Sequence, residues 1–173
     1  RGGLRTKVDE IVKSTALVDI HTHLYPPSFG ELLLRGIDAL LTYHYLVAET
    51  LRCLPEKTEE FWRLPSTAQA ELVWQTLFVE RSPVSEACRG VLTVLRLLGL
   101  DPGAHNLGVY RDYFAGLSPE EHVELVFKRT GLEMLVMTND PFDPEENIFW
   151  EQGRQGDERF RAALRLDKLL NDW

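Results

Sequence analysis

Three segments of the sequence have the pattern of buried β-strands, and a long helical stretch separates the first from the second. They are residues 17–21, 132–138 and 160–166, which are short, apolar and flanked by turn or helix signals. Parallel strands need long crossover connections, usually helical. The order of elements therefore predicts an α/β fold, with a parallel sheet and helices packed on it.

Helical periodicity and capping residues predict six helices in the rest of the chain. They are expected over residues 6–15, 37–54, from Ser66 to Phe78, 85–98, 107–114 and from Ser118 to the stop at Gly131. Ser66 with Gln69, and Ser118 with Glu121, have the spacing of a capping box. A loop is expected between the second and third strands, through Pro141 and the polar residues 153–157, and no closing helix is expected after the third strand.

Three strands make a small sheet for so much helix. A (β/α)8 barrel contains eight strands in roughly 250 residues, whereas this chain has 173 residues. We therefore expect residues 1–173 to be the N-terminal part of one metal-dependent TIM barrel domain. The helical region over about residues 30–131 is expected to be an insertion after the first strand.

The charge balance and the apolar runs exclude two classes of partner. There are 27 acidic against 19 basic residues, a net charge of −8, with no basic stripe to meet a phosphate backbone, so no nucleic-acid partner is expected. No apolar run approaches the roughly 20 residues that cross a bilayer, so no membrane partner is expected either. The N-terminus has no signal-peptide pattern, which predicts a cytoplasmic protein with Cys53 and Cys88 reduced.

His21 and His23 lie two residues apart at the end of the first predicted strand. Side chains at i and i+2 of a strand point to the same face, which suits two ligands of a divalent metal. The ordinary alternative is a pair of histidines in polar contacts. Active sites of barrels form at the carboxyl ends of the strands, and this favours the metal site.

Three further segments have both a structural and a functional interpretation. Tyr43, His44 and Tyr45 lie in an apolar helix, which by pattern alone favours an aromatic core. Arg89 belongs to a charged segment that could be a salt-bridged, capped helix junction, or could bind an anionic substrate. Arg165 lies near the end of the third predicted strand, where a barrel places binding residues, and its alternative partners are Asp167 and Asp140.

Five motifs together resemble the uronate isomerase (glucuronate isomerase) family of the amidohydrolase superfamily, in its N-terminal portion. They are residues 19–24 (DIHTHL), 40–49 (LLTYHYLVAE), 81–90 (RSPVSEACRG), 137–143 (MTNDPFD) and 163–167 (ALRLD). The motifs occur in the family's order and spacing, and they extend over nearly the whole chain.

The resemblance implies a distorted barrel and a role in carbohydrate metabolism and glucuronate catabolism. The implied reaction is the reversible aldose-ketose isomerisation of D-glucuronate to D-fructuronate and of D-galacturonate to D-tagaturonate. His21 and His23 match a metal-binding pair, for which zinc is the expected metal. His44, Tyr45 and Arg165 match catalytic and substrate-binding positions, Arg89 is a further substrate-binding candidate, and a homo-oligomer is a possible state.

Two other interpretations remain at this stage. One is metal-assisted hydrolysis, the commoner chemistry of the superfamily. The other is an inactive barrel fragment, whose sheet edges and apolar helix faces would be left unpaired.

Overall fold

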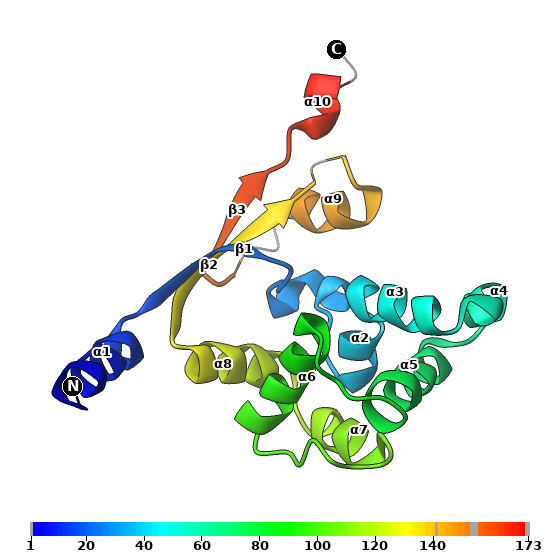
Figure 1. Ribbon diagram of the computed structural model, residues 1–173. Helices are drawn as coiled ribbons and strands as arrows, with labels where there is room; N and C mark the ends of the chain where they lie inside the picture. Colours follow the sequence, from blue (N-terminus) through cyan, green and yellow to red (C-terminus); the bar gives the residue numbers. More distant parts are fainter. Residues whose placement is uncertain (1, 141, 153–155, 172–173) are drawn as a thin grey trace. The chain divides into compact units, whose positions relative to one another are not determined.

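The computed structural model describes residues 2–140, 142–152 and 156–171 (Figure 1). Its contacts divide the chain into two compact units, and each is described by itself. The first unit combines Arg1–Leu33 with Pro119–Trp173, and the second is Leu34–Ser118. The expected turn residue Pro141 and residues 153–155 of the expected polar stretch lie outside the described residues.

The first unit contains a parallel sheet of three strands, in the order β1-β2-β3 (Figure 1). The strands are β1 (Leu17–Thr22), β2 (Leu132–Asn139) and β3 (Phe160–Leu164), and both pairs are parallel. The predicted mixed α/β fold, with a small parallel sheet and many helices, is thus confirmed.

One face of the sheet is covered by helices. Leu135, Met137 and Asn139 alternate along β2 and are buried, as the period of two of a strand requires. Val123 and Phe127 of α8 (Pro119–Thr130) pack against this face. The 3₁₀ segment η1 (Pro27–Leu32) contacts α9 (Pro144–Glu151): Phe29 stacks on the ring of Phe149 and meets the ring of Trp150 edge-on.

The expectation that the first strand is buried is wrong for the residues described. Leu17, Val18 and Ile20 are 49%, 50% and 78% exposed. β3 is also exposed after Phe160. The physical reason is position: in the three-stranded sheet β1 and β3 are both edge strands, each with one neighbour.

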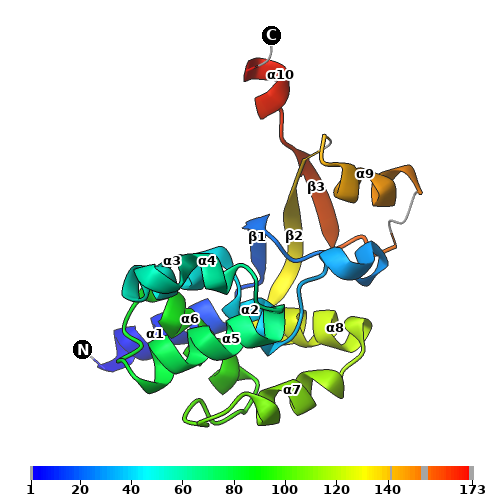
Figure 2. The ribbon, with the colours of Figure 1, turned by 90° about the vertical axis from the view of Figure 1, so that its right-hand side faces the viewer.

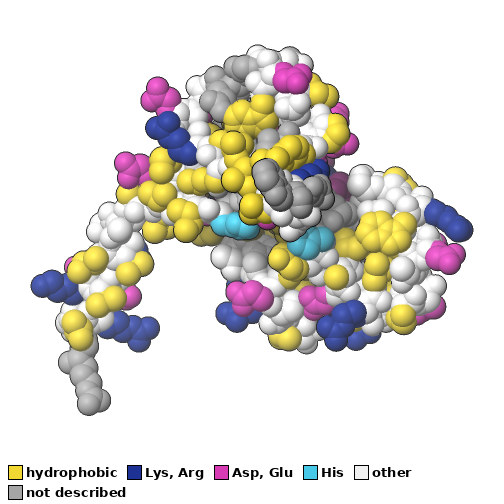
Figure 3. Space-filling view, turned by 90° about the horizontal axis from the view of Figure 1, so that it is seen from above, with side chains coloured by type: hydrophobic (Ala, Val, Ile, Leu, Met, Phe, Trp, Pro, Cys, Tyr) yellow, Lys and Arg dark blue, Asp and Glu magenta, His cyan; other side chains and the backbone are white. Residues whose placement is uncertain are grey.

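An N-terminal helix, α1 (Gly2–Ser14), precedes β1, as predicted from residue 6 onward. Its apolar residues Leu4, Val8, Ile11 and Val12 recur at helical spacing and are all exposed (Figure 3). The helix therefore carries an apolar stripe that no described part of the chain covers.

Two short helices lie where none was expected. α9 replaces the predicted loop: Asp143 accepts hydrogen bonds from the backbone N–H groups of Glu145 and Glu146, and Pro144 occupies the first helical position. α10 (Asp167–Asn171) follows β3, so the expected absence of a helix there is also wrong.

The second unit is entirely helical (Figure 2). It contains α2 (Ile37–Leu41), α3 (His44–Cys53), η2 (Pro55–Lys57), α4 (Thr58–Phe61), α5 (Ser66–Trp74), the π-helical turn η3 (Gln75–Val79), α6 (Glu86–Leu97) and α7 (Gly108–Ala115). Trp74 and Tyr110 are the largest buried side chains of its core. Their polar groups donate hydrogen bonds to backbone carbonyls. Trp74 Nε1 donates to Ala104 O at 3.2 Å, and the Tyr110 hydroxyl donates to Asp101 O at 2.6 Å.

Two local predictions in this unit need correction. The single helix expected over residues 37–54 is broken, because Tyr43 is extended (φ −64°, ψ 139°) and caps α3. Ser66 is not a cap: Pro65 holds that position, and Gln69 Nε2 instead donates to the carbonyls of Phe61 and Leu64, both at 3.1 Å.

The described residues include no helix that is both long and apolar enough to span a membrane.

Candidate functional site

The carboxyl ends of the three strands meet at one edge of the sheet, because the strands are parallel. His21 is the second-last residue of β1, and His23 directly follows the strand. Their ring centroids are 5.5 Å apart and the rings are nearly perpendicular. Both side chains are exposed, and the backbone N–H of His21 donates to Asp19 Oδ1 at 3.0 Å.

Thr138 connects this histidine pair to the neighbouring strand. Its Oγ1 lies 3.4 Å from Nδ1 of His21. Since Thr138 alternates with the buried residues Met137 and Asn139, the contact lies on the face of β2 opposite the helices.

The two imidazoles can serve as two of the ligands of a divalent metal. Metals such as zinc take three or four protein ligands. In the ranges 2–140, 142–152 and 156–171, no three His, Cys, Asp or Glu side chains are grouped so that they could hold an ion. The pair can thus supply two ligands, and a complete site needs more.

Arg165 extends the ladder of β3 by one residue, because its backbone N–H donates to Asn139 O at 2.8 Å. In the register, Ala163 pairs with Thr138, so alternation places Arg165 on the face that carries Thr138 and His21. Its Nε donates to Asp167 Oδ2 at 2.9 Å, one of the two partners expected. Both side chains are more than half exposed, so this pair holds the guanidinium only weakly.

His44 and Tyr45 lie in the second unit, at the start of α3. Both are exposed, so the aromatic-core interpretation of this segment is wrong; Leu46 and Val47 take the buried face instead. The rings of His44 and Tyr45 are in contact, with centroids 4.1 Å apart. His44 lines a cavity of about 450 Å³ whose other polar walls come from Arg35, Asp38, Thr42, Tyr43 and Ser66.

Tyr45 lines a second cavity of about 580 Å³, between α3 and the start of α6. Ser85 caps α6 by accepting from Cys88 N at 3.2 Å, and its hydroxyl donates to Glu49 Oε2 at 2.7 Å. Burial raises the pKa of the Cys88 thiol. The junction is therefore capped, as one interpretation expected.

Arg89 lies on the exposed surface of α6. It forms none of the ion pairs found in the described part of the chain, and neither does any other residue of the segment 80–90, so the salt-bridged form of the junction is not observed. The guanidinium is therefore not committed to a carboxylate of these residues.

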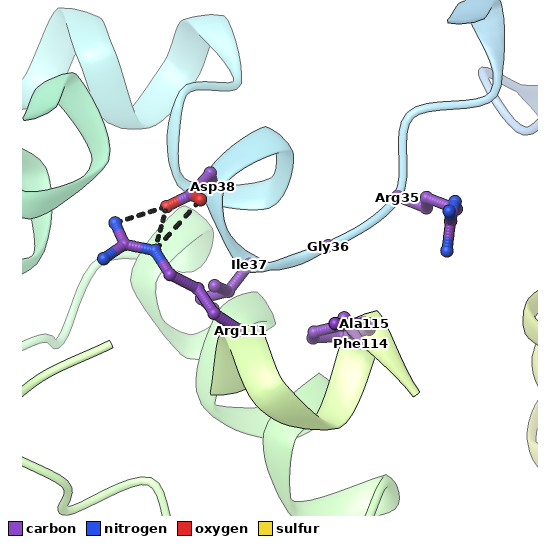
Figure 4. A pocket seen from close by; sticks show the side chains of 7 residues that line it. All are labelled: Arg35, Gly36, Ile37, Asp38, Arg111, Phe114 and Ala115. Atoms are coloured by element: carbon purple, nitrogen blue, oxygen red, sulfur yellow. Dashed lines mark hydrogen bonds and ion pairs between the residues drawn. The ribbon is translucent and has the colours of Figure 1, made fainter. Parts of the chain in front are cut away.

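Sequence reasoning missed the arginine of a third cavity, which has a volume of about 350 Å³ (Figure 4). Arg111 of α7 forms a bidentate contact with Asp38, with Nη2 2.8 Å from Oδ1 (Figure 4). It also pairs with Glu71. Hydrogen bonding to Asp38 raises the pKa of Arg111. Two carboxylates already neutralise this arginine, so it joins α2, α5 and α7 and is not free for a ligand.

Sequence reasoning also missed Glu146, a buried carboxylate of α9 that is 5% exposed. It accepts hydrogen bonds from the Tyr25 hydroxyl at 3.2 Å and from Asn139 Nδ2 at 2.5 Å. Burial, together with the charge of Glu146, raises the pKa of Tyr25 to about 12. The Asp-Pro start of α9 was a signal for the helix, but no sequence pattern marks this glutamate as buried.

The predicted site residues thus form two groups. His21, His23 and Arg165 share one edge of the sheet in the first unit. His44, Tyr45 and Arg89 belong to the helical unit.

Comparison with known proteins identifies a relative. Neither a family model nor a curated protein matches the chain. Among solved structures, a uronate isomerase from Bacillus halodurans is 54% identical, superposes with a TM-score of 0.94 and matches 99% of this chain. Nearly the whole chain is thus similar to part of one uronate isomerase. The expected resemblance to uronate isomerase is confirmed, and the chain spans 40% of the length of the Bacillus halodurans uronate isomerase.

Proposed function

We propose that the chain is part of a uronate isomerase, which interconverts D-glucuronate with D-fructuronate and D-galacturonate with D-tagaturonate. The observation that carries the proposal is the 54% identity to the Bacillus halodurans uronate isomerase over 99% of this chain. The exposed histidine pair and arginine at one sheet edge support it, because the reaction needs a cationic and metal-binding site for an anionic sugar.

The fold proposed for the whole protein is a distorted (β/α)8 barrel. The three strands are parallel and neighbour one another in sequence order, as consecutive strands of such a barrel do. The exposed apolar side chains of β1 support further strands beside it. Residues 1–173 would form the N-terminal part of the domain, with the helical region over about residues 30–131 inserted after β1.

A divalent metal, with zinc as the first candidate, would be held by His21 and His23. When bound, it would supply a Lewis acid that orients and polarises substrate oxygens. Further ligands would come from outside the described residues.

The side chains have roles that follow from the reaction. Moving a proton between C2 and C1 through a cis-enediol needs a positioned acid and base and a cation for the developing negative charge. Arg165 would bind an anion, either the substrate carboxylate or the enediolate, and Arg89 would add a second cation. His44 and Tyr45 would assist opening of the sugar ring and orient its hydroxyl groups.

The test is an isomerisation assay on the purified protein at its natural length, with glucuronate and galacturonate in deuterated water. We expect a ketouronate with the same elemental formula as the substrate, apart from deuterium that exchange introduces at the reacting carbons. No reaction with either sugar would contradict the proposal. A cytoplasmic location and a homo-oligomer are proposed as well, and light scattering of the same preparation tests the second.

A further inference from the structure

Glu146 differs from the other acidic residues of the fold in its surroundings. It lies in the first turn of α9 but is 5% exposed. Its Oε1 accepts from Asn139 Nδ2 at 2.5 Å and Trp150 Nε1 at 2.9 Å, and its Oε2 accepts from Tyr25 OH and Asp140 N, both at 3.2 Å. Four donors therefore use both oxygens of one carboxylate.

None of these donors is a cation. Glu146 forms none of the ion pairs found among the described residues. Its charge is met by neutral hydrogen-bond donors and by the amino end of its own helix. A buried charge held in this way is costly compared with an apolar side chain of the same size, so stability alone is a poor explanation for it.

The four donors come from three separate segments. Tyr25 follows β1, two residues after His23. Asn139 is the last residue of β2 and Asp140 follows it, and Trp150 belongs to α9. Asn139 Oδ1 is buried and has no hydrogen-bond partner among the residues described, so Glu146 is what orients this amide. The carboxylate thus joins the ends of two neighbouring strands.

These strand ends carry the histidine pair. Thr138, the residue before Asn139, contacts Nδ1 of His21, and Tyr25 fixes the chain just after His23. A shift of either strand end would change the orientation of an imidazole ring. A metal ligand must keep that orientation within narrow limits.

We propose that Glu146 is a positioning residue, which holds the carboxyl ends of β1 and β2 in the register that His21 and His23 need to bind a divalent metal. The inference rests on the proposed function only for the use of that metal. Glu146 lies on the helix-covered face and acts through Asn139, Asp140 and Tyr25.

The test compares Glu146→Gln with the matched control Glu145→Gln, at the natural length of the protein. Glutamine keeps the shape of the side chain, but its amide nitrogen is a donor that faces two of the four donors. Glu145 is exposed and lies one residue earlier in the same turn. Zinc affinity is measured by chelator competition well below the melting temperature, and the visible spectrum of the cobalt-loaded protein reports the ligand geometry.

We expect Glu146→Gln to weaken zinc binding by about ten- to a hundredfold and to change the cobalt spectrum, because residues that orient metal ligands have effects of this size. Glu145→Gln should match the wild type in both measurements. A folded Glu146→Gln protein with wild-type zinc affinity and an unchanged cobalt spectrum would overturn the proposal, even if its melting temperature fell, because that combination indicates a purely structural role.

A second variant decides the question if Glu146→Gln does not fold. Tyr25→Phe removes one donor and leaves the carboxylate with three, so it should fold and weaken zinc binding by a smaller factor; no change in zinc affinity would count against the proposal. Isomerase activity of the wild type is measured in parallel. An active wild type whose zinc affinity does not depend on Glu146 refutes only this inference, whereas a wild type that binds zinc but converts neither hexuronate refutes the proposed function alone.

Discussion

Thr138 Oγ1 lies 3.4 Å from Nδ1 of His21, so the end of β2 contacts the ring at the end of β1. A histidine that binds a metal through Nε2 carries its proton on Nδ1, where a hydroxyl oxygen can accept it. In that tautomer Thr138 fixes the ring and leaves Nε2 for the metal.

Thr138→Val should therefore weaken zinc binding by about tenfold, because the ring loses the partner that fixes its tautomer and rotation. Chelator competition measures the change. Thr130→Val is the control, since Thr130 Oγ1 donates within α8, to Val126 O at 2.7 Å. Equal zinc affinities of the two variants would show that the contact with His21 does not support metal binding.

Arg165→Met should lower kcat/KM for glucuronate by about a hundredfold, because hydrogen bonds from a guanidinium to an anion are among the strongest in proteins. Steady-state kinetics gives the value, and the division between kcat and KM tells whether the enediolate or the substrate carboxylate is the anion bound. Arg161→Met, which removes an exposed arginine four residues earlier, should have little effect. Unchanged kinetics in Arg165→Met would remove this residue from the site.

Asp157→Asn should make stability less sensitive to acid. Asp157 accepts hydrogen bonds from Arg159, with Oδ2 2.6 Å from Nη2, and this bonding lowers the pKa of its carboxyl group. The unfolded-state pKa is about 3.9, so the pair contributes stability above that pH and loses it as the pH falls toward the lower folded-state value.

Melting temperatures measured between neutral pH and pH 3 test this prediction. Below about pH 4 the wild type should lose stability more steeply than Asp157→Asn. Glu158→Gln, at the exposed neighbouring position, should follow the wild type. Parallel curves for wild type and Asp157→Asn would mean that the pair with Arg159 contributes no acid-sensitive stability.

Leu95→Ala should destabilise the helical unit by about 2–5 kcal/mol, the usual cost of truncating a fully buried leucine. Leu95 is 0% exposed in the core of this unit, whereas Leu97 on the same helix is 44% exposed. Chemical denaturation followed by tryptophan fluorescence measures the loss, because Trp74 lies in the same core. A loss in Leu95→Ala no larger than that in Leu97→Ala would contradict the packing described.

Features that depend on neighbours in the chain were predictable from the sequence. The three strands appear as apolar runs, and Ser85 and Gly131 mark helix ends as local signals do. Gly131 has a φ of 71°, a conformation that glycine adopts readily and that ends α8 directly before β2. The start of α9 had such a signal in Asp143 and Pro144 and was overlooked.

Features that depend on distant contacts were not predictable. The apolar residues of β1 have the pattern of a buried strand, but burial also requires a second neighbouring strand and a covered face. The apolar pattern alone favoured a core position for His44, whereas the family resemblance implied a site residue. His44 is exposed because the extended backbone at Tyr43 restarts the helix with a different face inward. Glu146 is buried only through partners up to 121 residues away along the chain.

The hydrogen bond from Arg35 Nη1 to Leu117 O is 2.8 Å long and joins the second and the second-last residues of the helical unit, Leu34–Ser118. The chain therefore enters and leaves the helical unit at nearly the same point. When the two ends of an inserted segment are held together by a hydrogen bond, the segment can change in length or sequence at little cost in loop-closure entropy. The sequence of the helical unit can then change while the strand ends keep their spacing.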